Sequence, residues 1–181
     1  MRTVNAHLFS SVDGNVESPN LFQFDCFGPD EAEMMTSAMS GIDTGIMGAQ
    51  IYREWSQYWP GVTDDFGPII NPMRKFVAST TLEAPLSWEN SELIEGELIE
   101  FVRELKTTEG GGITVFGISV IRQLLLAGLL DKLHLTIHPA SGGPGKRLFD
   151  GIDQPTRLEL LDAKVSSVGN LLTTYALKSA D

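Results

Sequence analysis

The sequence contains a single cysteine, Cys26, among its 181 residues. One thiol cannot form an intramolecular disulfide, and it falls short of the thiolate clusters that hold structural zinc. His134 and His138 are four residues apart, but on a strand this spacing separates the two side chains by about 13 Å, too far for one ion. We therefore expect neither an internal disulfide nor a metal site.

Long apolar runs and basic residues are also scarce. No apolar run approaches the roughly 20 residues of a membrane span, and Met1-Arg2-Thr3 does not begin a secretory signal, so we expect a cytoplasmic protein. The chain has 13 Lys and Arg against 24 Asp and Glu, a net charge of −11. Nucleic acids and anionic membranes need a basic surface, so neither is an expected partner, whereas a small anionic ligand needs only local donors.

The sequence does not match three familiar catalytic or nucleotide-binding motifs. Gly145-Lys146 invites comparison with the phosphate-binding loop G-x-x-x-x-G-K-[ST], but Ala140 and Arg147 occupy two of its required positions. The run 110–112 precedes its strand, and Val115 replaces the last glycine of G-x-G-x-x-G. No serine has a G-x-S-x-G elbow, so hydrolase chemistry has little support.

The most informative stretch that is present runs from Gly110 to Phe149. Ile113–Phe116 is a β-branched and aromatic run typical of a buried strand, and Gly117 then permits a sharp turn. A helix follows with apolar residues at helical spacing, ending at Gly128, and a second strand is expected at 133–138. A turn of this kind directs helix N–H groups at an anion, so the stretch predicts either a phosphate site or a plain crossover without ligand.

The rest of the chain alternates between strand and helix patterns. Further strands are expected near residues 3–9, 44–47, 75–79, 158–165 and 171–177. Helices are expected to open at 28–30 and to cover 51–59 and 92–106, with a surface loop over 60–72. No repeat or linker interrupts the pattern. The sequence therefore predicts one α/β domain over residues 1–181 that ends in an antiparallel hairpin.

Polar residues follow the first strand, where α/β sheets bind their ligands. Asp13 either orients a substrate and relays a proton or simply holds its own turn before Gly14. Phe22, Phe24 and Phe27 belong either to a lid over a site or to a surface loop pinned to the core. The acids that begin the next helix are expected mainly to form a solvated end favoured by the helix dipole.

Several short motifs occur in an order that is itself distinctive. They are Ser11-Val-Asp-Gly14, Asp43-Thr-Gly-Ile-Met-Gly48, Lys75-Phe-Val-Ala-Ser-Thr-Thr-Leu82, Ile113-Thr-Val-Phe-Gly117, Leu129-Leu-Asp-Lys-Leu133 and Leu148-Phe149. Together they resemble the dihydrofolate reductase-like superfamily, in the branch that includes the reductase domain of the bacterial riboflavin-pathway deaminase/reductase. The resemblance implies a three-layer α/β/α fold with a mostly parallel central sheet and NADPH lying across the carboxyl ends of its strands.

The resemblance also implies an activity and a set of site residues. The activity is reduction of a pterin- or pyrimidine-like molecule by NADPH, as in dihydrofolate reductase or 5-amino-6-(5-phosphoribosylamino)uracil reductase. An acid is needed to protonate the substrate; Asp13, Asp30 and Glu33 are the candidates, and Asp13 and Glu33 are preferred. The expected substrate contacts are Ser11, Asn15 and Phe27. The expected cofactor contacts are Val16, Gly48, Ala49, Gln50, Ser79, Thr80, Gly117, Ile118, Ser119, Val120 and Ile121.

Three positions depart from the family pattern. Ala49 and Thr80 stand where the family usually has cations that hold the cofactor phosphates, and Ile118 stands where it usually has glycine. We therefore expect only modest discrimination between NADPH and NADH, with Arg122 or Lys75 as substitutes for the missing charge. The alternative is a non-catalytic protein that binds a nucleotide or small molecule on the same scaffold.

The terminal hairpin has more apolar residues than one sheet face requires. Its strands, 158–163 and 171–177, are rich in leucine, and a hairpin of this composition is rarely left as a bare edge. The resemblance also points to dimers built from this region. We expect a homodimer, unless the chain's own helices cover the second face.

Overall fold

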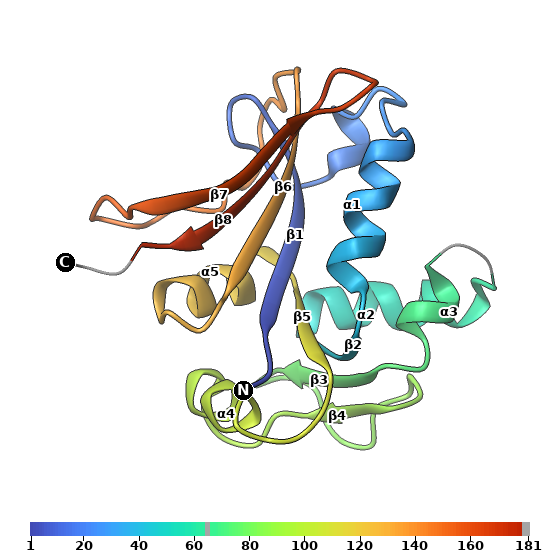
Figure 1. Ribbon diagram of the computed structural model, residues 1–181. Coiled ribbons are helices and arrows are strands. Elements are labelled where there is room, and N and C mark those ends of the chain that lie inside the picture. Colours follow the sequence, from blue (N-terminus) through green and yellow to red (C-terminus); the bar gives the residue numbers. More distant parts are fainter. Residues whose placement is uncertain (64–65, 179–181) are drawn as a thin grey trace. The chain divides into compact units, whose positions relative to one another are not determined.

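The computed structural model describes residues 1–63 and 66–178, and their contacts divide the chain into two compact units (Figure 1). The first unit comprises residues 1–4 and 41–129, and the second comprises residues 5–40 and those from 130 onward. The prediction of one domain over residues 1–181 remains a prediction.

The first unit contains four parallel strands in the order β4-β3-β2-β5. Their bounds are β2 Ile42–Gly48, β3 Arg74–Ala78, β4 Ser91–Leu93 and β5 Gly112–Phe116. The register pairs Gly48 with Ala78 and Met47 with Phe116, so these strands end at the same edge. The helices of this unit are α2 Ala49–Tyr58, α3 Gly67–Ile70, α4 Leu98–Leu105 and α5 Ile118–Leu126, with a 3-10 turn η2 at Trp59–Gly61.

Apolar burial holds the first unit together. Its described apolar side chains without any exposed surface are Val4, Ile46, Met47, Val77, Val102, Ile113, Val115, Ile121, Leu124 and Leu125. Burying one such side chain is worth roughly 1.5–3 kcal/mol, so the strands β2, β3 and β5 and the helix α5 form a core that fixes the edge where they meet.

The second unit contains strands β1 Val4–Ser11, β6 Lys132–His138, β8 Leu171–Leu177 and β7 Leu158–Val165, in this spatial order. β1 and β6 are parallel, whereas β6–β8 and β8–β7 are antiparallel. Helix α1, Pro29–Met39, lies along these strands, where the Asn5 amide donates to the carbonyl of Ala38 at 2.8 Å (Figure 1). A 3-10 turn, η1 Pro19–Leu21, lies in the loop before α1.

The fold class agrees with the prediction: a mostly parallel sheet with helices around it and an antiparallel C-terminal pair of strands. Each strand expected from the sequence is present, with bounds that differ from the expected ones by at most two residues. The β1 strand begins inside the first unit, where the N–H of Ile113 donates to the carbonyl of Thr3 at 2.8 Å. The expected turn between β7 and β8 is closed by a hydrogen bond from the N–H of Ser166 to the carbonyl of Asn170.

Two predicted elements were wrong. The helix expected over 92–106 begins only at Leu98, because Ser91–Leu93 pairs with β3 and the N–H of Ile94 donates to the carbonyl of Val77 at 2.9 Å. Gly96 then turns the chain with φ +81° outside any helix. The loop expected over 60–72 contains η2 and α3; its residues 64 and 65 lie outside the described part.

Within residues 1–63 and 66–178, no helix has the length and apolar character needed to cross a bilayer. The same residues contain no group of three or more His, Cys, Asp or Glu side chains placed to hold a metal ion.

Candidate functional site

The predicted cofactor residues of the first unit gather at the carboxyl edge of its sheet. Gly48 ends β2, the Ser79 turn follows β3, and Gly117 follows β5. Because neighbouring residues of these parallel strands are in register, the segments 48–50, 79–80 and 117–121 lie next to one another. The sequence prediction thus identified one continuous edge from three separate stretches.

Two helices begin at this edge, each preceded by a glycine. Gly48 is the N-cap of the ten-residue α2 and Gly117 is the N-cap of the nine-residue α5, and neither glycine has a side chain that caps its helix. The first N–H groups of an α-helix have no partner within the helix, and the helix dipole adds partial positive charge there. The edge therefore offers two sets of backbone donors suited to phosphate oxygens.

Close packing explains the glycine at position 117. Its φ is +95°, a conformation that side chains disfavour, and a Cβ added there would lie 3.1 Å from Cγ1 of Ile51. A Cβ added at Gly48 would lie 3.4 Å from a methyl of Val120. The starts of α2 and α5 therefore approach each other closely.

The sequence analysis predicted that Ser79 and Thr80, after β3, contact the cofactor. In the structure, the polar side chains of this turn form hydrogen bonds within the protein. Oγ of Ser79 accepts hydrogen bonds from the N–H groups of Thr81 and Leu82, at 3.0 and 2.9 Å, and so closes its own turn. Nη2 of Arg53, an exposed residue of α2, donates to Oγ1 of Thr81 at 2.8 Å. Arg53 is therefore a cation at the edge that the sequence reasoning missed.

Lys75, one of the cations considered as a substitute, does not serve the edge. Its side chain is 1% exposed, and its ammonium donates to the carbonyls of Asn71, Met73 and Glu89 at 2.8–3.0 Å. Burial lowers the pKa of Lys75 to about 8. This lysine stabilises the loops before β3 and β4.

In the second unit, Ser11, Asp13 and Asn15 form a tight polar turn after β1. Oγ of Ser11 donates to Asp13 at 2.6 Å and accepts from the N–H of Asn15 at 2.9 Å. Asp13 also accepts from the N–H of Gly142 at 2.8 Å and from Arg147 at 3.2 Å. The Ser11 hydroxyl, then the Gly142 amide and the Arg147 charge, hold the pKa of Asp13 below its usual value.

The glycine-rich loop 140–147 packs on Asn15. The amide of Asn15, 2% exposed, donates to the carbonyls of Gly142 and Pro144 at 2.7 and 3.3 Å. A Cβ at Gly142 or Gly145 would lie 2.5 or 2.4 Å from atoms of Asn15, which explains why glycine is needed at both positions. Asn15, predicted to contact substrate, thus has its side-chain NH2 group engaged by this loop, and its side-chain oxygen accepts from the N–H of Glu17 at 2.8 Å.

The remaining predicted residues of the second unit differ widely in exposure. Val16 is 7% exposed, with its N–H donating to the carbonyl of Lys146. Phe27 is 44% exposed, and its ring centroid lies 6.3 Å from that of Phe9 on β1. The Glu33 side chain is 78% exposed, with a carboxylate oxygen 3.9 Å from the ammonium of Lys164. Asp13, Glu33 and the other site residues remain predictions as to their roles.

Glu31, two residues before Glu33, is the buried acid of α1. It has no exposed surface, and its carboxylate accepts from the N–H of Gly28 at 2.9 Å and from the Asn170 amide at 2.7 Å. Burial alone would raise the pKa of Glu31, but hydrogen bonds from Ser166, Asn170 and Gly28 outweigh burial and lower it. The expectation of a solvated helix end was therefore wrong for Glu31, whose partner Asn170 lies 139 residues away in sequence.

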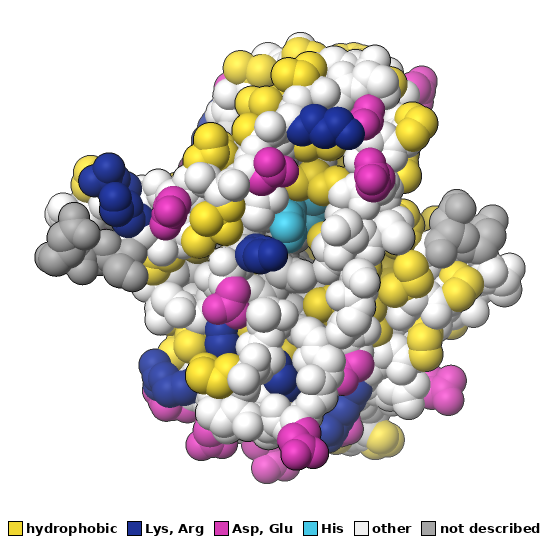
Figure 2. Space-filling model, viewed as in Figure 1, with side chains coloured by type: hydrophobic (Ala, Val, Ile, Leu, Met, Phe, Trp, Pro, Cys, Tyr) yellow, Lys and Arg dark blue, Asp and Glu magenta, His cyan; other side chains and the backbone are white. Residues whose placement is uncertain are grey.

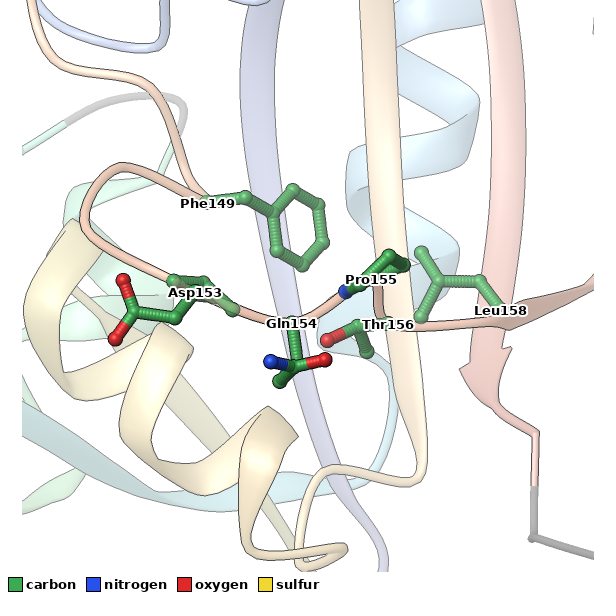
Figure 3. A pocket seen from close by; sticks show the side chains of 7 residues that line it. Phe149, Asp153, Gln154, Pro155, Thr156 and Leu158 are labelled. Atoms are coloured by element: carbon green, nitrogen blue, oxygen red, sulfur yellow. The ribbon is translucent and has the colours of Figure 1, made fainter.

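A separate hollow of about 360 Å³ lies in the second unit, in the loop between β6 and β7. Figure 3 shows the Phe149 ring and the Leu158 side chain at its sides, with Asp153, Gln154 and Thr156 supplying its polar atoms. None of the predicted site residues lines this hollow.

With this geometry established, comparison with known proteins is informative. Residues 2–173 match the family described as RibD C-terminal domain. The chain belongs to this family. It is also 28% identical to the uncharacterized protein YyaP of Bacillus subtilis (strain 168), over 96% of this chain and 94% of that one.

Solved structures share the fold of this RibD C-terminal domain. A protein of Shewanella sp. PV-4, whose name refers to riboflavin biosynthesis, matches with TM-score 0.79 and 19% identity, over 98% of this chain and 99% of that one. Dihydrofolate reductase from Enterococcus faecalis, complexed with NADP(H), matches with TM-score 0.63 and 13% identity, over 98% and 97% of the two chains. The resemblance inferred from the motifs is thus confirmed, and the fold is of the reductase type.

Proposed function

We propose that this protein is an NAD(P)H-dependent reductase of a pterin- or pyrimidine-like small molecule in the cytoplasm. The observation that carries the proposal is the edge of the first unit, where α2 and α5 both begin beside the ends of β2, β3 and β5. Membership of the RibD C-terminal domain family supports it.

The residues at this edge suit a dinucleotide. The helix starts at Gly48-Ala49-Gln50 and at 117–121 supply backbone donors for a pyrophosphate, and Arg53 supplies positive charge. When bound, the reduced nicotinamide supplies the hydride, so the protein's task is mainly to position the substrate and exclude water. Ile118 begins α5 without distorting the Gly117 turn, which keeps φ +95°.

The turn of the second unit supplies the polar groups proposed to face substrate. Asp13 is a carboxylate at neutral pH, as aspartates ordinarily are, and its hydrogen bonds lower its pKa further. We therefore assign Asp13 the role of orienting a water molecule, which donates the proton that accompanies the hydride. Glu33, exposed beside Lys164, is the second choice for this role.

The alternative is a non-catalytic protein that binds a nucleotide or another small molecule on the same scaffold, with an eroded cofactor site. It is favoured by the uncharged residues Ala49 and Thr80 at the edge and by the engagement of the Asn15 amide within its own loop. Only the reductase oxidises a bound dinucleotide, so turnover distinguishes the two functions.

The test is a titration of the purified protein with NADPH and NADH, followed by tryptophan fluorescence, which Trp55 and Trp59 in the first unit should report. Oxidation of the bound cofactor is then measured with dihydrofolate and with a phosphoribosylaminouracil as substrates. Binding with turnover supports the reductase, and binding without turnover of any such heterocycle supports the alternative. If neither dinucleotide binds, the reductase is rejected, and only the binding of another small molecule is left.

A further inference from the structure

One phenylalanine of the loop before α1 is buried while its neighbours are exposed. Phe22 is 1% exposed, whereas Leu21 is 68% and Phe24 is 71% exposed. Figure 2, in the same view as Figure 1, shows hydrophobic side chains gathered at the end of the molecule where this loop and the β7–β8 turn lie. The loop therefore exposes apolar side chains while inserting a single aromatic ring.

The inserted ring lies on a buried polar pair. The Phe22 centroid is 5.9 Å from that of His138, whose other side faces Phe9 at 5.8 Å. His138 is 1% exposed, and neither of its ring nitrogens has a hydrogen-bond partner among the described residues. Oδ1 of Asn170 is also buried without a hydrogen bond of good geometry. Burial lowers the pKa of His138, and the nearby Glu31 carboxylate and Asn170 side chain oppose that shift.

The apolar Phe22 ring cannot form hydrogen bonds with the buried polar atoms of His138 and Asn170. Buried polar groups in folded proteins are nearly always hydrogen-bonded, because burial without a partner costs free energy. Here the two ring nitrogens of His138, against which Phe22 packs, and Oδ1 of the neighbouring Asn170 lack a hydrogen bond of good geometry within the described residues. Packing of the core alone does not account for this arrangement.

The loop formed by residues 18–27 can move with the loss of few hydrogen bonds to the rest of the second unit. Backbone hydrogen bonds of residues 18–27 run within the loop itself, as from Phe22 to Pro19 and from Cys26 to Gln23. A tie to the rest of the second unit is the Asn170 amide, which donates to the carbonyl of Cys26 at 2.8 Å. Three non-glycine residues of the loop have positive φ, Ser18, Phe24 and Asp25, a conformation that stores strain.

We propose that Phe22 is an internal plug, and that a planar nitrogen heterocycle displaces its ring and binds the His138–Asn170 pair. A neutral imidazole has one donor and one acceptor, and the Asn170 oxygen is an acceptor. The ligand edge that satisfies them carries a ring N–H next to a carbonyl. This inference rests on the proposed function, in which the space left by the displaced Phe22 ring, the Phe22 slot, holds the substrate ring. His138 and Asn170 then recognise that ring, and the Phe22 side chain competes with it.

The experiment uses lumazine as a fluorescent probe, without dinucleotide. Phe22→Ala should bind lumazine about tenfold more tightly than the unmodified protein, as expected for the recovery of one or two hydrogen bonds. Phe24→Ala, which removes an exposed ring from the same loop, should leave the affinity unchanged. 1,3-Dimethyllumazine, which lacks the ring N–H groups, should gain nothing from Phe22→Ala.

A double variant assigns the gain to the polar pair. Adding His138→Phe to Phe22→Ala should abolish the gain, and Phe22→Leu serves as the opening variant if Phe22→Ala does not fold. The proposal is overturned if Phe22→Ala leaves the affinity for lumazine unchanged or if Phe24→Ala raises it equally. It is also overturned if Phe22→Ala raises the affinity for 1,3-dimethyllumazine as much as that for lumazine. Because NADPH is absent, failure here is separate from failure of the dinucleotide titration.

Discussion

Arg53 donates from its guanidinium to the hydroxyl of Thr81 at 2.8 Å, linking α2 to the turn after β3. This contact brings a positive charge to the edge where Ala49 and Thr80 are uncharged. Arginine is well suited to phosphate because its planar group presents several donors.

Arg53 is proposed to pair with the 2′-phosphate, which NADPH has and NADH lacks. Arg53→Gln is therefore expected to weaken NADPH binding roughly fivefold, as for one exposed charge pair, and to leave NADH binding unchanged. Titration calorimetry with both dinucleotides measures the effect. Arg103→Gln, an exposed arginine of α4 paired with Glu100, is the matched control and should change neither affinity. If the unmodified protein prefers NADPH by more than about 100-fold, roughly 2.7 kcal/mol, a further cation contributes.

Gly117→Val tests the turn before α5. The substitution places a branched side chain at φ +95° and within 3.1 Å of Ile51, so it should separate the starts of α2 and α5. We expect nucleotide affinity to fall more, in free energy, than the free energy of unfolding measured by urea titration. Gly61→Val, at a position with open space around a Cβ, is the control. Unchanged binding in Gly117→Val would place the nucleotide elsewhere.

The strands were predictable because β-branched runs such as Ile113–Phe116 indicate them locally. The predictions that failed depend on contacts between residues far apart in the sequence. Apolar residues around Ile94 match a helical period, but hydrogen bonding to Val77 makes that stretch extended. The sequence also could not reveal that Arg53 reaches Thr81, 28 residues later, or which of three alternating phenylalanines is buried. The positions of the candidate site at the strand ends could be predicted once the fold was inferred. The hydrogen-bond partners of its side chains could not, because those partners lie in loops far away in the sequence.

The histidines of the second unit predict a loss of stability in mild acid. Burial, together with His134 and His138, lowers the pKa of His7 from 6.5 to about 3. Because the unfolded state takes up this proton first, stability present above pH 6.5 is lost progressively as the pH falls toward 3. At about pH 5 the loss from His7 alone is about 2 kcal/mol, since one pKa unit is about 1.4 kcal/mol.

Urea unfolding measured from about pH 7 to about pH 5 checks this expectation, in a range above the titration of most carboxylates. His7→Gln should reduce the slope of stability against pH while leaving a remainder from His134 and His138, whose pKa values burial also lowers. A slope unchanged by His7→Gln would show that this histidine is protonated alike in both states.

The β7–β8 hairpin is proposed to form the interface of a homodimer. The register divides β7 into a charged face and an apolar face, whose Leu160 and Val165 are 55% and 71% exposed. Leu171 on β8, opposite Val165, is 40% exposed on the same face. The chain's own helices thus leave this face open, and an exposed edge strand of this kind favours pairing with a second copy.

Light scattering coupled to size exclusion should give twice the 19.8 kDa monomer mass at micromolar concentration. Leu160→Glu should shift the mass toward the monomer, whereas Glu159→Gln on the charged face should not. A monomer mass for the unmodified protein would contradict the dimer.

The central claim is that the edge of the first unit binds a dinucleotide through the starts of α2 and α5. The most direct measurement is a ¹⁵N-resolved NMR titration with NADPH that follows individual backbone amides. The largest shifts are predicted at Ala49, Gln50, Ile118, Ser119 and Val120, and none are predicted along the outer strand β7 of the second unit. Saturable shifts confined to other segments, or no shifts at millimolar NADPH, would contradict the account.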